Sequence, residues 1–280
     1  MVTMKIKNKY FNLIALLIIL FIVGSNSGCI KADTYAAPGE TFYGTIYDSV
    51  TGKPMQFDQN EARIQVLELS YKASAPTPNP DFYANDTGYF YNSRLFTGKY
   101  NVNIIGPFVP MAPQWPTVYN STDPTKNIQI QGVVKQDYTV SPILEIRWVT
   151  PPVYNPSDSS ISATITVSRG NTTPPYSTGA IKNINFYIAG NSPYPGDASY
   201  DGRYTVTMSS FPANATVVIN GVTTPNPFAF GNNYIVKTQG KIPAISGSTW
   251  WARVGASTAT SLPVVGTPYN YTNIQAVTIK

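Results

Sequence analysis

The sequence predicts an all-β protein that contains two β-sandwich domains. Beyond the first 29 residues, no segment repeats its apolar residues at the 3.6-residue period of an amphipathic helix, whereas several segments alternate apolar and polar residues as strands do. The 280 residues include 24 prolines and 20 glycines, and only 12% are charged. This composition is typical of strands that are joined by frequent turns.

The first 28 residues have the pattern of a secretory signal peptide. Lys5, Lys7 and Lys9 provide a positive start, an apolar run covers residues 11–23, and small and polar residues then lead to Gly28. This order is typical of an export signal with a small-residue cleavage site. The apolar run is shorter than the roughly 20 residues of a transmembrane helix. About 250 residues remain after residues 1–28, which is enough for two domains.

Cys29 is the only cysteine of the chain and directly follows the expected cleavage site. The Gly-Cys pair resembles a bacterial lipobox, in which the cysteine sulfur receives a lipid, although Asn26 stands where a lipobox usually has Leu. Acyl chains on Cys29 would hold the protein on a membrane, with residues 29–38 as a lipidated tether. The alternative is a secreted protein with an incidental cysteine.

Residues 39–140 are expected to form the first sandwich. Residues 48–54 are rich in turn formers, and Gly52 among them can adopt a positive φ. Residues 85–88 predict a second tight turn. We expect Asp48 and Asp86 to cap these turns through their side chains. Strands are expected at residues 41–47, 64–69, 89–91, 99–105 and 127–131.

Residues 141–280 are expected to form the second sandwich, because Pro142 restricts the chain and the strand pattern restarts there. Trp148 lies on the apolar phase of its strand and is expected in the core. Strands are expected at residues 143–148, 161–168, 184–188, 203–208, 216–219, 234–239, 249–254 and 274–279. About eight half-buried strands of this kind are typical of an immunoglobulin-like sandwich.

The residues that the sequence lacks narrow its chemistry. The chain has no histidine, which excludes Ser-His-Asp and Cys-His catalysis, and its single cysteine excludes a CxxC metal site. We find no phosphate-binding glycine loop. We therefore expect no enzyme activity, no cofactor and no metal. Removing residues 1–28 leaves 16 basic against 14 acidic residues, and without a basic cluster we expect no nucleic-acid partner.

Three motifs of the first domain resemble a carboxypeptidase-regulatory-type domain. They are GTIYDSVTGKP at residues 44–54, DTGYF at residues 86–90 and LFTGKY at residues 95–100. The resemblance implies a transthyretin-like, seven-stranded β-sandwich for residues 39–140.

The whole chain resembles the two-domain Bacteroidetes lipoproteins of domain-of-unknown-function family 3823. Further matching positions are Lys31, Asp33 and residues 106–108, 251–255 and 269–271. Members of that family are typically encoded beside outer-membrane transporters and SusD-like glycan-binding lipoproteins. The resemblance implies a non-catalytic lipoprotein that assists polysaccharide uptake at the outer membrane. Its partners would be a polysaccharide and a transporter or SusD-like protein. The cell surface is favoured over the periplasmic face, which stays open. The alternative is a structural adaptor that docks a transporter complex without binding glycan.

Candidate glycan-binding residues are aromatic side chains that the strand pattern directs outward. In residues 250–254, alternation places Trp250 on the core face and directs Trp251 and Arg253 outward together. With Tyr269 and Tyr271, they would form a stacking platform for a sugar ring. Trp115, in a proline-rich loop, is a second candidate, because loops on a rigid sandwich often carry function. The alternatives are that Trp251 packs under a loop or the other domain, and that Trp115 fills the interface between the domains.

Overall fold

The computed structural model describes residues 37–70, 77–78, 81–110, 127–209, 216–219, 222–225, 228–259, 262 and 269–280. Residues 38–280 form one compact unit. Every regular element in the described ranges is a β-strand, which confirms the prediction of an all-β chain with β-sandwich domains. No helix within these ranges has the length and apolar character needed to cross a membrane. Cys29 and Trp115 lie outside the described residues.

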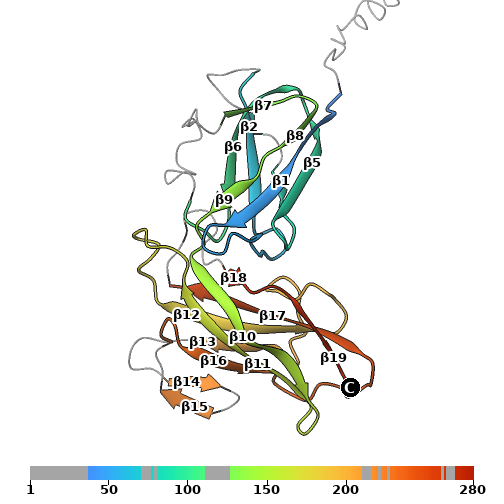
Figure 1. Cartoon of the computed structure of the whole chain (residues 1–280), viewed down its shortest axis with the longest axis vertical. Helices are drawn as coiled ribbons and strands as arrows, with labels where there is room; N and C mark the ends of the chain where they lie inside the picture. The colour runs from blue at the N-terminus through green and yellow to red at the C-terminus, as the bar shows by residue number, and fades with distance from the viewer. Residues whose placement is uncertain are drawn as a thin grey trace, which may run out of the picture. The chain divides into compact units, whose positions relative to one another are not determined.

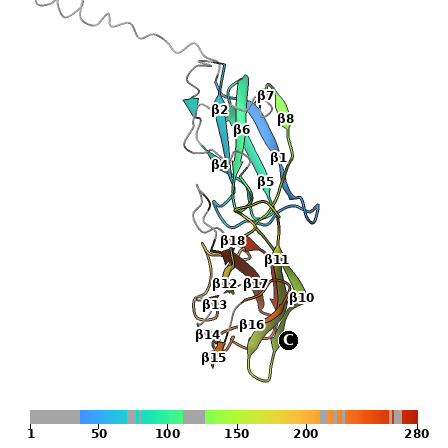
Figure 2. The ribbon, with the colours of Figure 1, turned by 90° about the vertical axis from the view of Figure 1, so that its left-hand side faces the viewer.

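Two sheets made from residues 40–140 face each other (Figures 1 and 2). In the first sheet, the central strand pairs antiparallel with one neighbour and parallel with two others. Its strands are β1 (Glu40–Asp48), β5 (Tyr89–Leu95), β8 (Val133–Lys135) and β9 (Tyr138–Val140), with β1 in the centre. The second sheet is antiparallel and consists of β2 (Arg63–Glu68), β3 (Thr77–Pro78), β4 (Phe82–Tyr83), β6 (Gly98–Ile105) and β7 (Asn127–Ile130).

The core of this first sandwich follows from strand alternation. Along β1, every second residue from Phe42 to Asp48 is buried, and the residues between them are half-buried. Phe42 and Phe90 of the first sheet pack into one cluster with Ile64 and Val102 of the second sheet. Since side chains of both sheets meet there, the apolar face of each sheet is removed from water.

Residues 144–278 form two larger sheets and a separate hairpin (Figure 1). One sheet consists of β10 (Leu144–Asn155), β11 (Ser160–Arg169) and β16 (Asn233–Lys237). The other consists of β12 (Ile181–Ala189), β13 (Val206–Ser209), β17 (Thr249–Thr258), β18 (Tyr269–Tyr271) and β19 (Gln275–Thr278). The hairpin pairs β14 (Thr216–Ile219) with β15 (Val222–Pro225).

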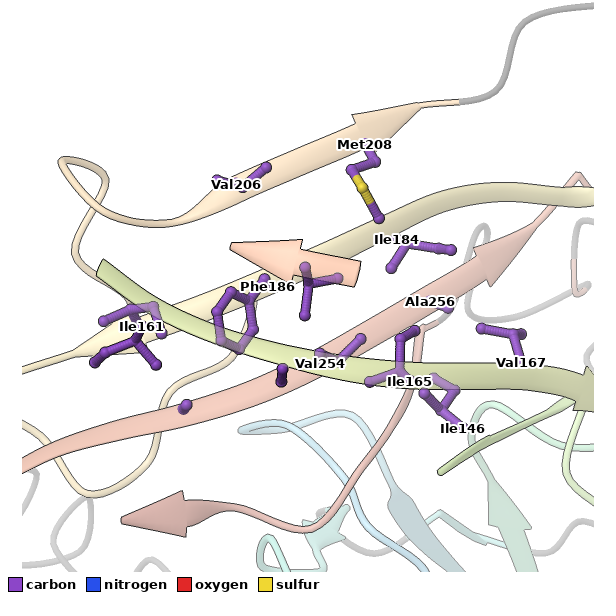
Figure 3. Close-up of a cluster of buried hydrophobic side chains, with 14 of the residues drawn as sticks. Ile146, Ile161, Ile165, Val167, Ile184, Phe186, Val206, Met208, Val254 and Ala256 are labelled. Carbon is purple, nitrogen blue, oxygen red and sulfur yellow. The ribbon is translucent and has the colours of Figure 1, made fainter. Parts of the chain in front are cut away.

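The second core lies between these two sheets (Figure 3). Ile161, Ile165 and Val167 of β11 meet Phe186 of β12 and Val254 of β17 there. Trp148 is half-buried against this cluster, and its ring packs edge-on to Phe186 with 6.5 Å between ring centroids. The sequence predicts Trp148 in the core, and the structure places it at the edge of that core.

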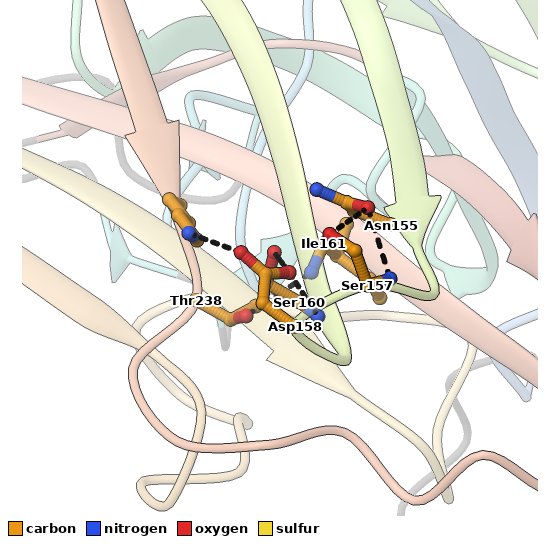
Figure 4. A network of polar contacts seen from close by, with 7 residues as sticks. Asn155, Ser157, Asp158, Ser160, Ile161 and Thr238 are labelled. Atoms are coloured by element: carbon orange, nitrogen blue, oxygen red, sulfur yellow. Dashed lines mark hydrogen bonds and ion pairs between the residues drawn. The ribbon is translucent and has the colours of Figure 1, made fainter.

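Short polar side chains fix the turn that joins β10 to β11 (Figure 4). Asn155 Oδ1 accepts hydrogen bonds from the backbone N–H and the hydroxyl of Ser157. Asp158 accepts bonds from Ser160 and forms an ion pair with Lys237 at 2.6 Å. Such side-chain bonds satisfy the backbone groups that a turn leaves without strand partners.

The two turns of the first sandwich are capped by one expected residue and one unexpected residue. Asp48 Oδ1 accepts the Val50 N–H at 2.7 Å, as the sequence predicts. In the second turn, Asn85 Oδ1 rather than the Asp86 side chain accepts the N–H groups of Thr87 and Tyr89. Asn85 lies two residues before Thr87, which is the spacing of an Asx-turn. This spacing explains why Asn85 rather than Asp86 caps the turn.

Candidate functional site

The expected platform around Arg253 is buried. Arg253 does lie on the face of β17 opposite Trp250, as alternation predicts, but its side chain is only 1% exposed. The prediction that Arg253 points outward is therefore wrong, and Tyr271 beside it is buried as well. The reason is that residues 57–61 of the first sandwich cover this face of the second sheet, which a strand pattern cannot reveal.

Arg253 joins the two sandwiches through backbone carbonyls. Its Nη1 donates to the carbonyl of Phe57 at 2.7 Å, and its Nε donates to the carbonyl of Thr272 at 3.0 Å. The guanidinium carbon lies 4.3 Å from the centroid of the Tyr271 ring, within the range of a cation–π contact. Its Nη2 is buried and has no hydrogen-bond partner in the described part of the chain.

Two acids of the first sandwich complete this cluster. Asp58 Oδ2 accepts the N–H of Ala198 at 2.8 Å and the hydroxyl of Tyr271 at 3.4 Å. Glu61 Oε2 accepts the N–H of Asp58, and Oε1 accepts the N–H of Tyr269. Loss of hydration raises the pKa of Glu61 to about 8, with a smaller contribution from the nearby Asp58 charge. The cluster therefore serves to hold the two sandwiches together.

The remaining candidates do not form an open platform. Trp251 is half-buried on β17, opposite Ala189 and Ala276. Tyr269 is half-buried, and its ring centroid lies 6.2 Å from that of Tyr271, which is buried. The structure brings Arg253, Tyr269 and Tyr271 together as predicted, but as packing between the sandwiches.

Exposed aromatic side chains gather instead around a groove of about 650 Å³. Four tyrosines line it, Tyr83, Tyr89, Tyr91 and Tyr194, and each is between 41% and 59% exposed. Polar side chains lie among them, including Asn60, Asn85, Asp86, Ser192 and Ser199. We call this feature the tyrosine groove.

The tyrosines are placed by ordinary strand geometry. Tyr89 and Tyr91 flank Phe90, which is buried in the first core, so alternation along β5 directs both tyrosines outward. Their partners across the strand pair are Thr45 and Tyr43 of β1. Tyr83 ends β4, and Tyr194 belongs to the loop between β12 and β13 of the second sandwich. Both sandwiches therefore contribute to the groove.

The chemistry of the groove suits a sugar. An exposed phenol ring is apolar on its face and carries a hydroxyl at its edge, so one residue offers both a stacking surface and a hydrogen bond. Amide, hydroxyl and carboxylate groups nearby can donate to and accept from ring hydroxyls. Within the described ranges, no group of three or more acidic, histidine or cysteine side chains could hold a metal ion.

A second cleft, of about 830 Å³, contains Trp148, Lys53 and a pair of acids. Asp48 and Glu145 are both buried, and the Asp48 carboxylate acts on the carboxyl group of Glu145. Burial, together with the Asp48 carboxylate, raises the pKa of Glu145 to about 8. The pair is a contact between the sandwiches, since Asp48 ends β1 and Glu145 lies in β10.

Sequence reasoning missed the tyrosine groove although one signal was present. Tyr89 and Tyr91 alternate with a buried Phe90 over three residues, which is too short a run to distinguish the two faces without the fold. Tyr83 and Tyr194 carry no pattern of their own, because they reach the groove from a two-residue strand and from a loop.

Comparison with known proteins places the first sandwich in a family. Residues 40–141 match the model of a protein of unknown function (DUF3823) N-terminal domain. None of the curated proteins matches the chain.

Solved structures are similar over most of the chain. A DUF3823 family protein from Bacteroides uniformis ATCC 8492 is 25% identical, and the match covers 87% of this chain and 100% of that chain with a TM-score of 0.69. A "putative carbohydrate binding protein" from the same organism is 18% identical over 86% and 99% of the two chains, with a TM-score of 0.62. A DUF3823 family protein from Parabacteroides merdae ATCC 43184 is 14% identical over 86% and 100%, with a TM-score of 0.57. At such low identity, the last two show the fold alone. The motifs, the matching family model and the shared fold agree, so the chain carries the N-terminal domain of the DUF3823 family at residues 40–141.

Proposed function

We propose that this protein is a non-catalytic glycan-binding lipoprotein of a bacterial cell envelope, and that the tyrosine groove is its binding site. The observation that carries the proposal is the gathering of four exposed tyrosines with amide, hydroxyl and carboxylate groups in one groove. Exposed aromatic rings that gather in one place mark a ligand-binding surface, and a sugar ring covers an aromatic face well.

Two further observations support this reading. One structure of the same fold is named a "putative carbohydrate binding protein". The N-terminal signal and Cys29 resemble those of lipoproteins, which would keep the groove at a membrane. A SusD-like protein or an outer-membrane transporter is the partner that this setting implies.

The proposal is tested by Tyr91→Ala, because Tyr91 is 55% exposed and lines the groove. Binding of the purified protein to a panel of polysaccharides is measured by affinity gel electrophoresis. For each glycan that binds, we expect the variant to bind on the order of tenfold more weakly, since a loss of about 1.4 kcal/mol corresponds to that factor.

The matched control is Phe96→Ala. Phe96 is 45% exposed but does not line the groove, so its removal should leave binding unchanged. A panel without any bound glycan, or equal losses in the two variants, would contradict the proposal.

A structural adaptor is the second candidate, and the buried junction around Arg253 favours it. A fixed junction of this kind suits a spacer that holds its second sandwich in a set orientation. In that case the protein would co-purify with an outer-membrane transporter while Tyr91→Ala leaves the complex intact.

A further inference from the structure

The charges that line the tyrosine groove carry an inference about its ligand, which rests on the proposed function. Its lining contains two acids, Asp58 and Asp86, and one base, Arg253. Every other lining side chain is uncharged: tyrosine, phenylalanine, alanine, asparagine, glutamine or serine. The charge of the lining is therefore net negative.

The single base is not available to a ligand. Arg253 is 1% exposed, and its Nη1 and Nε already donate to the carbonyls of Phe57 and Thr272. Its Nη2 lacks a hydrogen-bond partner in the described ranges, but that atom is also buried beneath the groove surface. The charges of Asp58 and Asp86 both act on Arg253, so its positive charge is compensated from within the protein.

The acids are placed differently from the base. Asp58 is buried, with its carboxylate bonded to Gln59, Ala198 and Tyr271, whereas Asp86 is half-buried and reaches solvent. Asp197, which accepts the hydroxyl of Tyr187, is exposed two residues from Ser199 of the lining. The charge that a ligand in the groove meets first is therefore negative.

We propose that the tyrosine groove selects neutral glycans and rejects acidic ones. A uronate carboxylate or a sulfate would lose hydration on entering, would find no accessible cation, and would face Asp86. The hydroxyl groups of a neutral sugar can instead donate to the Asp86 carboxylate and bond to Asn60, Ser192 and Ser199.

The test compares forms of one glycan that differ in charge. Any neutral polysaccharide that the intact protein binds is prepared as its carboxymethyl derivative and, to match the added bulk, as its hydroxyethyl derivative. We expect the hydroxyethyl form to bind nearly as well as the parent and the carboxymethyl form to bind at least about tenfold more weakly at low salt. High salt should reduce the difference, because it screens the repulsion from exposed charges.

A variant of Asp86 tests whether the repulsion of acidic glycans comes from the groove. Asp86→Asn should improve binding of the carboxymethyl form relative to the parent by about fivefold, the factor expected for removing one unit charge a few ångströms away in water. The two forms are compared within each variant, because the parent also loses a carboxylate acceptor in Asp86→Asn. Asp158→Asn, which removes the same charge from an ion pair with Lys237 outside the lining, should change neither.

Four outcomes overturn the inference, and they have different meanings. Tightest binding to a natural acidic glycan such as polygalacturonate, or equal binding of the two derivatives, would refute selection by charge and leave glycan binding intact. An unchanged preference in Asp86→Asn would refute the role of the groove charges. Failure of every glycan, neutral or acidic, would remove the proposed function itself.

Discussion

Arg253 is the side chain that connects the two sandwiches at their buried junction. It is fully buried, it bonds to carbonyls of both sandwiches, and it lies over the ring of Tyr271. Arginine suits this position because its planar group has several donors with fixed directions, whereas lysine has a single ammonium. The residue thus determines how residues 57–61 meet the second sheet.

Arg253→Ala is expected to lower the free energy of unfolding by about 3 kcal/mol or more. The change would leave the carbonyls of Phe57 and Thr272 without these donors, and it would remove a buried positive charge that interacts with Asp58. Unfolding in urea, followed by tryptophan fluorescence, measures the loss.

Arg203→Ala is the control for this experiment. Arg203 forms an ion pair with Asp201 at 2.7 Å, but its side chain is 76% exposed, and such pairs contribute about 1 kcal/mol or less. Equal losses in the two variants would contradict the structural role assigned to Arg253.

The sequence predicted the face on which Arg253 lies but not its burial. Alternation along residues 250–254 correctly separates Trp250, Ala252 and Val254 from Arg253. Whether the outer face meets water depends on a loop that lies almost 200 residues earlier in the chain. A local pattern contains no information about that contact. The residues that were expected to form an open platform therefore form a buried junction between the sandwiches.

The turn from Asn85 to Tyr89 also depends on both its own residue types and contacts with residues distant in the sequence. Gly88 has a φ of +76°, which a tight turn of this kind requires, and the sequence predicts the turn from its residue types. The turn also packs closely: a Cβ on Gly88 would lie 2.8 Å from the Ile46 carbonyl oxygen and 2.9 Å from that of Met55.

Gly88→Ala is therefore expected to destabilise the protein by more than Gly52→Ala. Gly52 has a φ of +66°, but an added Cβ would meet no atom within 4 Å, so only the backbone strain of about 1 kcal/mol applies. At Gly88 the same strain is joined by two backbone clashes. Thermal unfolding of the two variants measures the difference, and a larger loss at Gly52 would contradict this account.

Among strands, those of six or more residues were predictable and the shortest were not. Each of the longer strands overlaps a stretch whose alternation or apolar content predicts a strand, and they are β1, β2, β5, β6, β10, β11, β12 and β17. β4, β8, β9 and β18 have two or three residues each, too few to display a period. They form because a longer strand offers them an edge, which is a property of the tertiary structure.

Across the molecule, two acids with raised pKa lie where the sandwiches meet. Glu61 accepts the N–H of Tyr269, and the carboxyl group of Glu145 in the second sandwich interacts with Asp48 of the first. Burial raises the pKa of each to about 8 from an ordinary value of 4.5. Between these values the folded protein holds protons that the unfolded chain has released.

Stability is therefore expected to fall as the pH rises from about 5 to about 8 and then to level off, because the unfolded state binds fewer protons in this range. The slope should be on the order of 1 kcal/mol per pH unit for each group. Urea unfolding at several pH values measures it.

Glu145→Gln and Glu61→Gln identify the groups responsible. Each glutamine keeps a polar side chain of similar shape but cannot ionise, so each variant should flatten the pH dependence, and the double variant should remove most of it. A double variant that keeps the slope of the original protein would show that other groups cause it.

The parallel pairing of β1 with β9 determines how the first sandwich responds to tension. The chain enters this sandwich through β1 and leaves it through β9, and the two strands lie side by side in the same direction, with Ile46 opposite Tyr138 and Asp48 opposite Val140. A pull applied to both ends of the sandwich would slide one strand along the other, so that the hydrogen bonds between them bear the load together rather than opening one at a time. Forced unfolding is governed by the height of the unfolding barrier, and this arrangement places the barrier at the first and last strands of the domain.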